Sequence, residues 1–184
     1  MKRPIFAAAF VFFLSGTFNT ALALEKWQTL PTPPPLPNSS RSGYAPVNGI
    51  QMYYVLYGKG DPILLIPIGM ADAGMWSGEI AGLAKHHTVI VADSRGHGRS
   101  TRTEDAYSYD LMSSDYLALL DYLKIKKVAL VGASDGAIIG LDIAIHHPER
   151  LSKLFAQGAN ATTDGVFDNA ADPTASIRFR SPAR

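Results

Sequence analysis

Short apolar segments that alternate with helix-forming segments constrain this fold more than any other feature of the sequence. The apolar segments are Pro62 to Ile66 (PILLI), Thr88 to Ala92 and Lys127 to Val131 (KVALV). Between them, residues from Met75 to Lys85 and from Leu111 to Leu123 have the spacing of helices. Short strands that are apolar throughout and separated by helices predict a parallel sheet covered on both faces.

An antiparallel hairpin is expected before the parallel strands. Residues Tyr44 to Val47 and Ile50 to Tyr57 are suited to strands, and the pair Asn48-Gly49 between them favours a two-residue turn. The sheet is therefore predicted to be mixed.

One more helix and strand follow along the chain. A helix is expected from about Asp135 to His147, ended by Pro148, and a strand from Leu151 to Gln157. The complete pattern predicts an α/β fold with a mixed, mostly parallel sheet and helices on both faces, ending after about the sixth strand.

The first 23 residues are predicted to be a signal peptide. Lys2 and Arg3 precede an apolar stretch, Ile5 to Leu14, and the small-residue sequence Ala21-Leu22-Ala23 follows. Cleavage is expected after Ala23, with export to the periplasm or the outside and no stable membrane anchor afterwards. An uncleaved anchor is the alternative, but polar residues interrupt the apolar run before it reaches spanning length.

The rest of the chain is expected to hold one domain with irregular flanks. Residues 24–42 are predicted to be an extended tether, because Pro31 to Pro37 (PTPPPLP) cannot form a helix or a sheet interior. A proline-rich recognition site is the alternative. Residues 43–166 are predicted to form the core, and residues 167–184 an irregular tail.

Charge and cysteine content exclude several functions. The 17 basic and 16 acidic residues nearly balance, so nothing indicates a nucleic-acid partner. The absence of cysteine excludes disulfides, thiolate metal sites and a cysteine nucleophile. A small-molecule substrate is expected, with no metal and no organic cofactor.

The motif Gly132-Ala133-Ser134-Asp135-Gly136 is a GxSxG sequence that lies between a predicted strand and a predicted helix, where such a motif indicates a catalytic serine. It directly follows a predicted strand and directly precedes a predicted helix. Small residues two places before and two places after the serine let strand and helix approach closely. The Ser134 hydroxyl is then expected beside backbone N–H groups that stabilise negative charge.

Several segments in one order resemble the α/β-hydrolase family. They are the hairpin region GYAPVNGIQMYYVLYGKGDP, the strand PILLI with its glycine-containing loop and Trp76, DSRGHGRS, GASDG and HHPERL. Together they cover about residues 43–166. The resemblance implies a hydrolase that acts on a small carboxylic ester or similar acyl compound.

By this resemblance, Ser134 is the nucleophile that forms an acyl-enzyme, and the Asp135 N–H is half of the oxyanion hole. Family members that open epoxides or displace halide carry an aspartate in place of Ser134, so those reactions are disfavoured. Gly69 is expected to give the second N–H, with Met70 as the alternative. The family usually has His-Gly in that loop, where this sequence has Pro67-Ile68-Gly69.

The resemblance also implies a histidine and a carboxylate after Ser134, and the sequence offers no fitting pair. His146 and His147 lie at the far end of the helix that follows Ser134, about 18 Å away at 1.5 Å per residue. Asp164 and Asp168 are candidates for the acid, but they lack a base to orient. A truncated or frame-shifted product is the expectation that follows.

The segment Asp93 to Ser100 is interpreted as a structural turn, although it contains His97 close to acidic and basic residues. Two functions remain open at this point. One is a serine hydrolase with Ser134 as nucleophile, and the other is a truncated non-catalytic remnant or small-molecule-binding protein.

Overall fold

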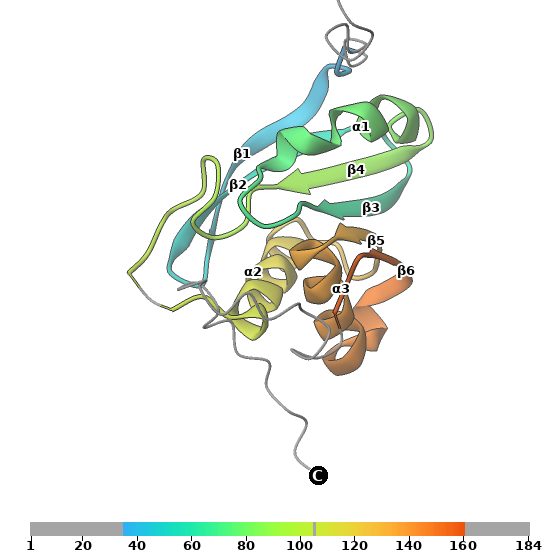
Figure 1. Cartoon of the computed structure of the whole chain (residues 1–184). Helices are drawn as coiled ribbons and strands as arrows, with labels where there is room; N and C mark the ends of the chain where they lie inside the picture. Colours follow the sequence, from blue (N-terminus) through green and yellow to red (C-terminus); the bar gives the residue numbers. More distant parts are fainter. Residues whose placement is uncertain (1–34, 105, 161–184) are drawn as a thin grey trace, which may run out of the picture. The chain divides into compact units, whose positions relative to one another are not determined.

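The computed structural model describes residues 35–104 and 106–160 of the chain (Figure 1). The expected signal peptide, the expected tail, and both Asp164 and Asp168 therefore lie outside the described residues. Among the helices of these ranges, none combines the length and the apolar character that a membrane span requires.

The described elements form one six-stranded sheet with helices, in the strand order β1-β2-β4-β3-β5-β6. The first two strands pair antiparallel with each other and β2 pairs antiparallel with β4, while the β3, β4, β5 and β6 pairings are parallel. This confirms the predicted mixed, mostly parallel sheet. The elements are β1 (Ser39–Val47), β2 (Ile50–Tyr57), β3 (Asp61–Ile66), the 3-10 helix η2 (Ala73–Trp76), α1 (Ser77–Leu83), β4 (His87–Ala92), α2 (Tyr109–Tyr122), β5 (Val128–Ala133), α3 (Asp135–His146), the 3-10 helix η3 (Pro148–Arg150) and β6 (Leu151–Gln157).

The hairpin turn has the conformation that its sequence predicts. Asn48 and Gly49 both have positive φ, 41° and 78°, and Val47 pairs with Ile50 on either side of them. Two successive positive φ values characterise the type I′ turn, whose twist matches that of the flanking strands.

Strand β1 begins at Ser39, inside the segment that the sequence predicts as tether, and this corrects the expected start of the core at residue 43. Ser39 and Arg41 pair with β2, and the Ser40 Oγ donates a hydrogen bond of 3.1 Å to the Leu56 carbonyl. Polar residues 39–42 have no apolar alternation, so only the backbone pairing with β2 reveals that they form a strand.

Helices cover both faces of the sheet, as predicted (Figure 1). On one face, α2 and α3 pack on a buried cluster that includes Leu64, Ile90, Leu120 and Ile139. On the other face, η2 and α1 pack on a second cluster, which includes Trp76.

A buried ion pair joins the loop after β4 to α2. The Arg95 guanidinium donates to both carboxylate oxygens of Asp115, at 2.9 Å from Nε and 2.7 Å from Nη2. The exposed fractions of the two side chains are 3% and 1%. Asn48 completes the network, since its carbonyl accepts from Arg95 and its Nδ2 donates to Asp115. The hairpin turn is thus tied to α2.

Strand β6 lies at one edge of the described sheet, where it pairs with β5. Its Phe155 side chain is 61% exposed, and Ile145 on the neighbouring helix α3 is 68% exposed. This edge of the described sheet therefore exposes two large apolar side chains.

Candidate active site

Ser134 lies between the end of β5 and the start of α3, with φ 49° and ψ −116°. A positive φ is strained for a residue with a side chain, and such strain persists only where the surroundings enforce it. Here the Ser134 N–H donates to the Gln157 carbonyl of β6 at 2.8 Å. The Ser134 carbonyl accepts from Ala137 and Ile138, which begins the helix. The side chain itself is exposed.

The two glycines that flank Ser134 fill positions without room for a side chain. A Cβ at Gly132 would collide with the backbone of Gly136, and a Cβ at Gly136 would collide with the backbone carbonyl of Ile66. The end of β3, the turn and the first turn of α3 therefore approach one another more closely than any larger residue allows.

The loop after β3 lies beside the Ser134 turn because β3 and β5 are adjacent parallel strands, with Ile66 paired to Gly132. Gly69 in this loop packs against the Asp135 carboxyl group so closely that it has no room for a Cβ. Within the described residues, the N–H groups of Gly69 and Asp135 have no hydrogen-bond acceptor. Two open N–H groups near an exposed serine can stabilise a negative oxygen.

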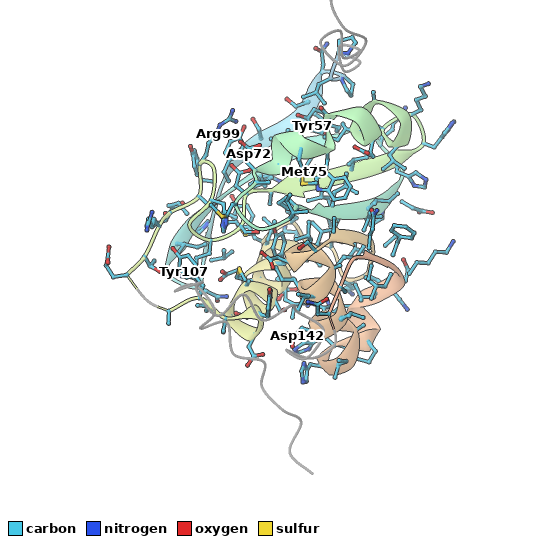
Figure 2. All side chains as sticks on the ribbon, in the orientation of Figure 1. Tyr57, Asp72, Met75, Arg99, Tyr107 and Asp142 are labelled. Carbon is cyan, nitrogen blue, oxygen red and sulfur yellow. The ribbon has the colours of Figure 1, made fainter. Side chains whose placement is uncertain are left out.

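Met70, the alternative to Gly69, has a positive φ of 60°, and the residue is 97% exposed. The preceding Ile68 donates its N–H to the Met75 Sδ at 3.3 Å, and Met75 is labelled in Figure 2. The Asp72 carboxylate caps η2 by accepting from the Gly74 N–H at 2.7 Å. The loop with Pro67 and Ile68 is thus held by local contacts even though it departs from the His-Gly pattern.

Tyr109, the first residue of α2, is a site residue that the sequence analysis did not identify. Its hydroxyl donates a hydrogen bond of 2.6 Å to the Asp135 Oδ1. Burial raises the pKa of Tyr109, and the hydrogen bond and negative charge of Asp135 raise it further, so the hydroxyl keeps its proton. In the sequence this tyrosine has the spacing of an ordinary core residue, so nothing there indicated its partner.

The segment Asp93 to Ser100 forms a partly buried turn whose contacts are structural. The Asp93 carboxylate accepts from the Ala73 N–H and from the Arg99 N–H, each at 2.8 Å. The His97 Nδ1 lies 2.8 Å from the Arg95 carbonyl oxygen. These contacts fit the interpretation of the segment as a turn that also fixes the start of η2.

Within residues 35–104 and 106–160, the Ser134 hydroxyl has no hydrogen-bond partner, and no group of three acidic or histidine residues could hold a metal ion. His146 and His147 lie at the opposite end of α3 from Ser134. His146 pairs there with Asp142 at 3.1 Å. The structure therefore brings Ser134, Gly69 and Asp135 together and keeps both histidines apart from them.

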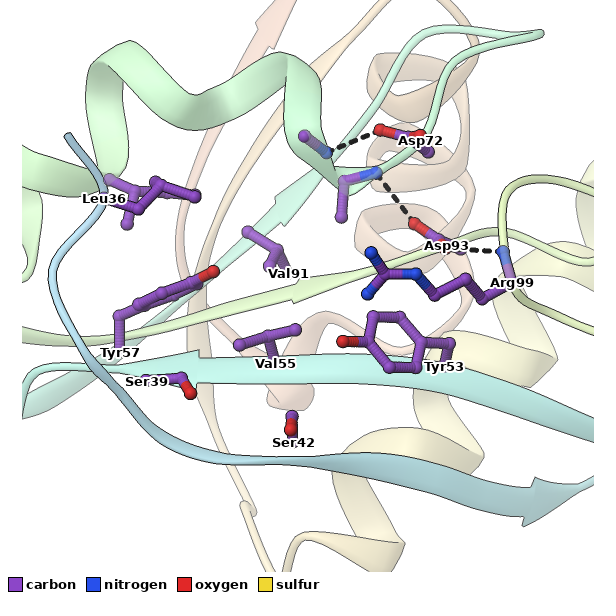
Figure 3. A pocket seen from close by; sticks show the side chains of 13 residues that line it. Leu36, Ser39, Ser42, Tyr53, Val55, Tyr57, Asp72, Val91, Asp93 and Arg99 are labelled. Carbon is purple, nitrogen blue, oxygen red and sulfur yellow. Dashed lines mark hydrogen bonds between the residues drawn. The ribbon is translucent and has the colours of Figure 1, made fainter. Parts of the chain in front are cut away.

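A cavity of about 350 Å³ lies elsewhere, on the face of the sheet that α1 covers (Figure 3). The Arg99 guanidinium lies over the Tyr53 ring at 4.5 Å, beside Val55 and Val91. Neither the serine nor the open N–H groups line this cavity. We therefore place the candidate active site at the Ser134 turn rather than in this cavity.

Comparisons with known proteins identify the family and the fold. Residues 61–179 match the family model described as the alpha/beta hydrolase fold. A protein of Azorhizobium caulinodans assigned as the carbamate hydrolase RutD is 35% identical over 67% of this chain and 47% of its own length. The human serine hydrolase BPHL is 35% identical over 67% of this chain and 44% of its own length.

The crystal structure of the enol-lactonase from Burkholderia xenovorans superposes with a TM-score of 0.59 at 33% identity, over 60% of this chain and 44% of that one. The chain thus spans less than half the length of these relatives. The matched family model, the strand order and these relatives lead to one conclusion. This chain belongs to the α/β-hydrolase fold family.

Proposed function

We propose that this chain carries the nucleophile and the oxyanion-binding groups of a serine hydrolase that acts on a small carboxylic ester or similar acyl compound. The observation that carries the proposal is the Ser134 turn. An exposed serine with φ 49° lies at the start of α3, and the N–H groups of Gly69 and Asp135 are open beside it. This is the arrangement that acyl transfer to a serine requires.

The reaction then has two halves. The Ser134 Oγ attacks the ester carbonyl, and the negative oxygen of the tetrahedral intermediate accepts hydrogen bonds from Gly69 and Asp135. The alcohol leaves with the serine proton, which a base transfers to it. Water next attacks the acyl-enzyme, which releases the carboxylic acid and restores the serine hydroxyl. For the whole protein, we propose that a base takes up this proton and that a carboxylate orients the base.

The relatives support a hydrolytic reaction without fixing one substrate. Their names include a carbamate hydrolase, a serine hydrolase and an enol-lactonase. All three are consistent with attack on a carbonyl carbon that bears an oxygen or nitrogen leaving group. We propose that export by a signal peptide brings the protein to its substrate, and that no metal or organic cofactor takes part.

A serine-reactive fluorophosphonate tests the proposal directly. We expect it to label the chain on Ser134, since phosphorus is attacked as a carbonyl carbon would be. The Ser134→Ala variant should lose the labelling completely, as measured by intact-mass spectrometry and peptide mapping. Ser152→Ala is the matched control, because Ser152 is an exposed serine on β6 outside the site.

Two results would contradict the hydrolase proposal. Labelling that persists in Ser134→Ala would place the reactive group elsewhere. No labelling of the unaltered chain, together with saturable binding of a small molecule, would instead favour the non-catalytic binding protein.

A further inference from the structure

The cavity between η2 and β2 contains three polar side-chain ends that face one another, away from the candidate active site. Its volume is about 350 Å³, and its lining includes Tyr53, Tyr57 and Arg99 beside the apolar side chains of Val55 and Val91. In Figure 3 the Arg99 guanidinium and the hydroxyl ends of both tyrosines point toward the middle of this space. A cavity of this size has room for a small organic molecule.

The hydroxyl of Tyr57 is a buried donor without an acceptor. Tyr57 is only 8% exposed, and across residues 35–104 and 106–160 its hydroxyl forms no hydrogen bond. Burial raises the pKa of Tyr57, so the hydroxyl keeps its proton at neutral pH and remains a donor. Buried donors in proteins nearly always have a partner, because an unmade hydrogen bond costs free energy. A molecule that brings an acceptor into the cavity would supply this partner.

Arg99 gives the cavity a positive charge. In the part of the chain that the structure describes, its guanidinium forms no ion pair, and it lies over the Tyr53 ring at 4.5 Å. Its charge also reaches the Tyr57 hydroxyl, where it lowers the pKa against the larger effect of burial. The guanidinium and the hydroxyl therefore act on the same space.

Two carboxylates also line the cavity, and both accept hydrogen bonds from backbone N–H groups. Each oxygen of Asp93 accepts one bond of 2.8 Å, from the N–H of Ala73 and from the N–H of Arg99. Asp72 accepts from the Gly74 N–H at 2.7 Å and is exposed, so solvent and salt screen its charge. Both carboxylates hold η2 in place, and the Arg99 guanidinium keeps its donors for another acceptor.

We propose that this cavity is a binding site for a small organic carboxylate, separate from the Ser134 site. The carboxylate oxygens accept from the Arg99 guanidinium and from the Tyr57 hydroxyl, and the apolar body of the ligand packs on Val55 and Val91. The planar guanidinium suits this ligand, because its parallel N–H groups match the two oxygens of a carboxylate. The inference does not rest on the proposed hydrolase function, because Ser134 does not line the cavity.

Titration of the full chain with benzoate and with benzamide tests the preference for a carboxylate. The two molecules share the ring and differ in charge. With binding followed by NMR, we expect benzoate to bind about tenfold more tightly, the effect of one charge-assisted hydrogen bond. Ser134→Ala should bind benzoate as the unaltered chain does. Loss of benzoate binding in Ser134→Ala would place the ligand in the active site and overturn the inference.

Variants identify the groups that are responsible. Arg99→Met keeps the apolar stem and removes the charge, so the affinities for benzoate and benzamide should become about equal. Tyr57→Phe removes only the hydroxyl and should lower the preference for benzoate partway. Arg102→Met is the matched control, because Arg102 is an exposed arginine of the same loop that does not line the cavity. Equal binding of the two molecules by the unaltered chain, an unchanged preference in Arg99→Met or a lost preference in Arg102→Met overturns the inference.

Two further measurements separate this site from simple anion binding and from the hydrolase function. Inorganic phosphate should displace benzoate only at concentrations at least about tenfold higher, because it has no apolar body to bury. Equal displacement would overturn the organic carboxylate as the ligand. Benzoate binding in a chain that the fluorophosphonate does not label supports this site and contradicts only the hydrolase proposal. Labelling without any preference for benzoate supports the hydrolase proposal and overturns this site.

Discussion

Asp115→Ala should destabilise the folded chain by about 3–5 kcal/mol, because it leaves a buried arginine without its counter-charge. The Arg95 and Asp115 side chains are 3% and 1% exposed, and two hydrogen bonds join them. After the substitution, the guanidinium keeps only the carbonyl of Asn48 as a protein acceptor among these partners. Urea unfolding followed by circular dichroism measures the loss.

A double variant distinguishes an unpaired charge from a simple loss of packing. Arg95→Met combined with Asp115→Leu removes both charges and roughly keeps the volume, so it should cost less than Asp115→Ala alone. If the double variant lost as much stability as the single one or more, the unpaired charge would not be the cause. The side-chain amide of Asn48 loses its Asp115 acceptor in both variants, so that loss cancels in the comparison.

Gly136→Ala should destabilise the chain by about 3 kcal/mol and reduce labelling of Ser134. Helix propensity alone predicts that Gly136→Ala stabilises the chain, because alanine is favoured over glycine inside a helix by about 1 kcal/mol. The new Cβ collides with the backbone carbonyl of Ile66, and β3 cannot withdraw without breaking its pairing with β5. Urea unfolding and the fluorophosphonate assay measure the two effects.

Gly82→Ala is the matched control for this prediction. Gly82 lies in α1, where an added Cβ has open space within 4 Å, so the variant should be neutral or more stable by up to about 1 kcal/mol. The stability change of Gly140→Ala in α3 should lie between those of Gly136→Ala and Gly82→Ala. The new Cβ meets only the ends of the Leu130 and Leu154 side chains, which can shift. If Gly136→Ala were as stable as Gly82→Ala, the close approach to β3 would not limit this position.

Most of the fold could be predicted from the sequence because its signals are local. Apolar runs with no polar alternation specify the buried parallel strands, and Asn48-Gly49 specifies the hairpin turn. The strand, turn and helix around Ser134 follow from the GxSxG context. The start of β1 at Ser39 could not be predicted, because it depends on a partner strand and not on residues 39–42 themselves.

The sequence by itself determined the family, the order of the strands and helices, and the serine at the turn before α3, because spacing and local backbone preference encode these features. Only the tertiary structure decided which distant groups meet there. Tyr109 lies 26 positions before Asp135 in the chain, and their hydrogen bond exists because α2 and α3 pack on the same face of the sheet. Likewise, Gly69 reaches the turn only because β3 pairs with β5. Contacts between separate elements depend on how those elements pack, which local residue patterns do not specify.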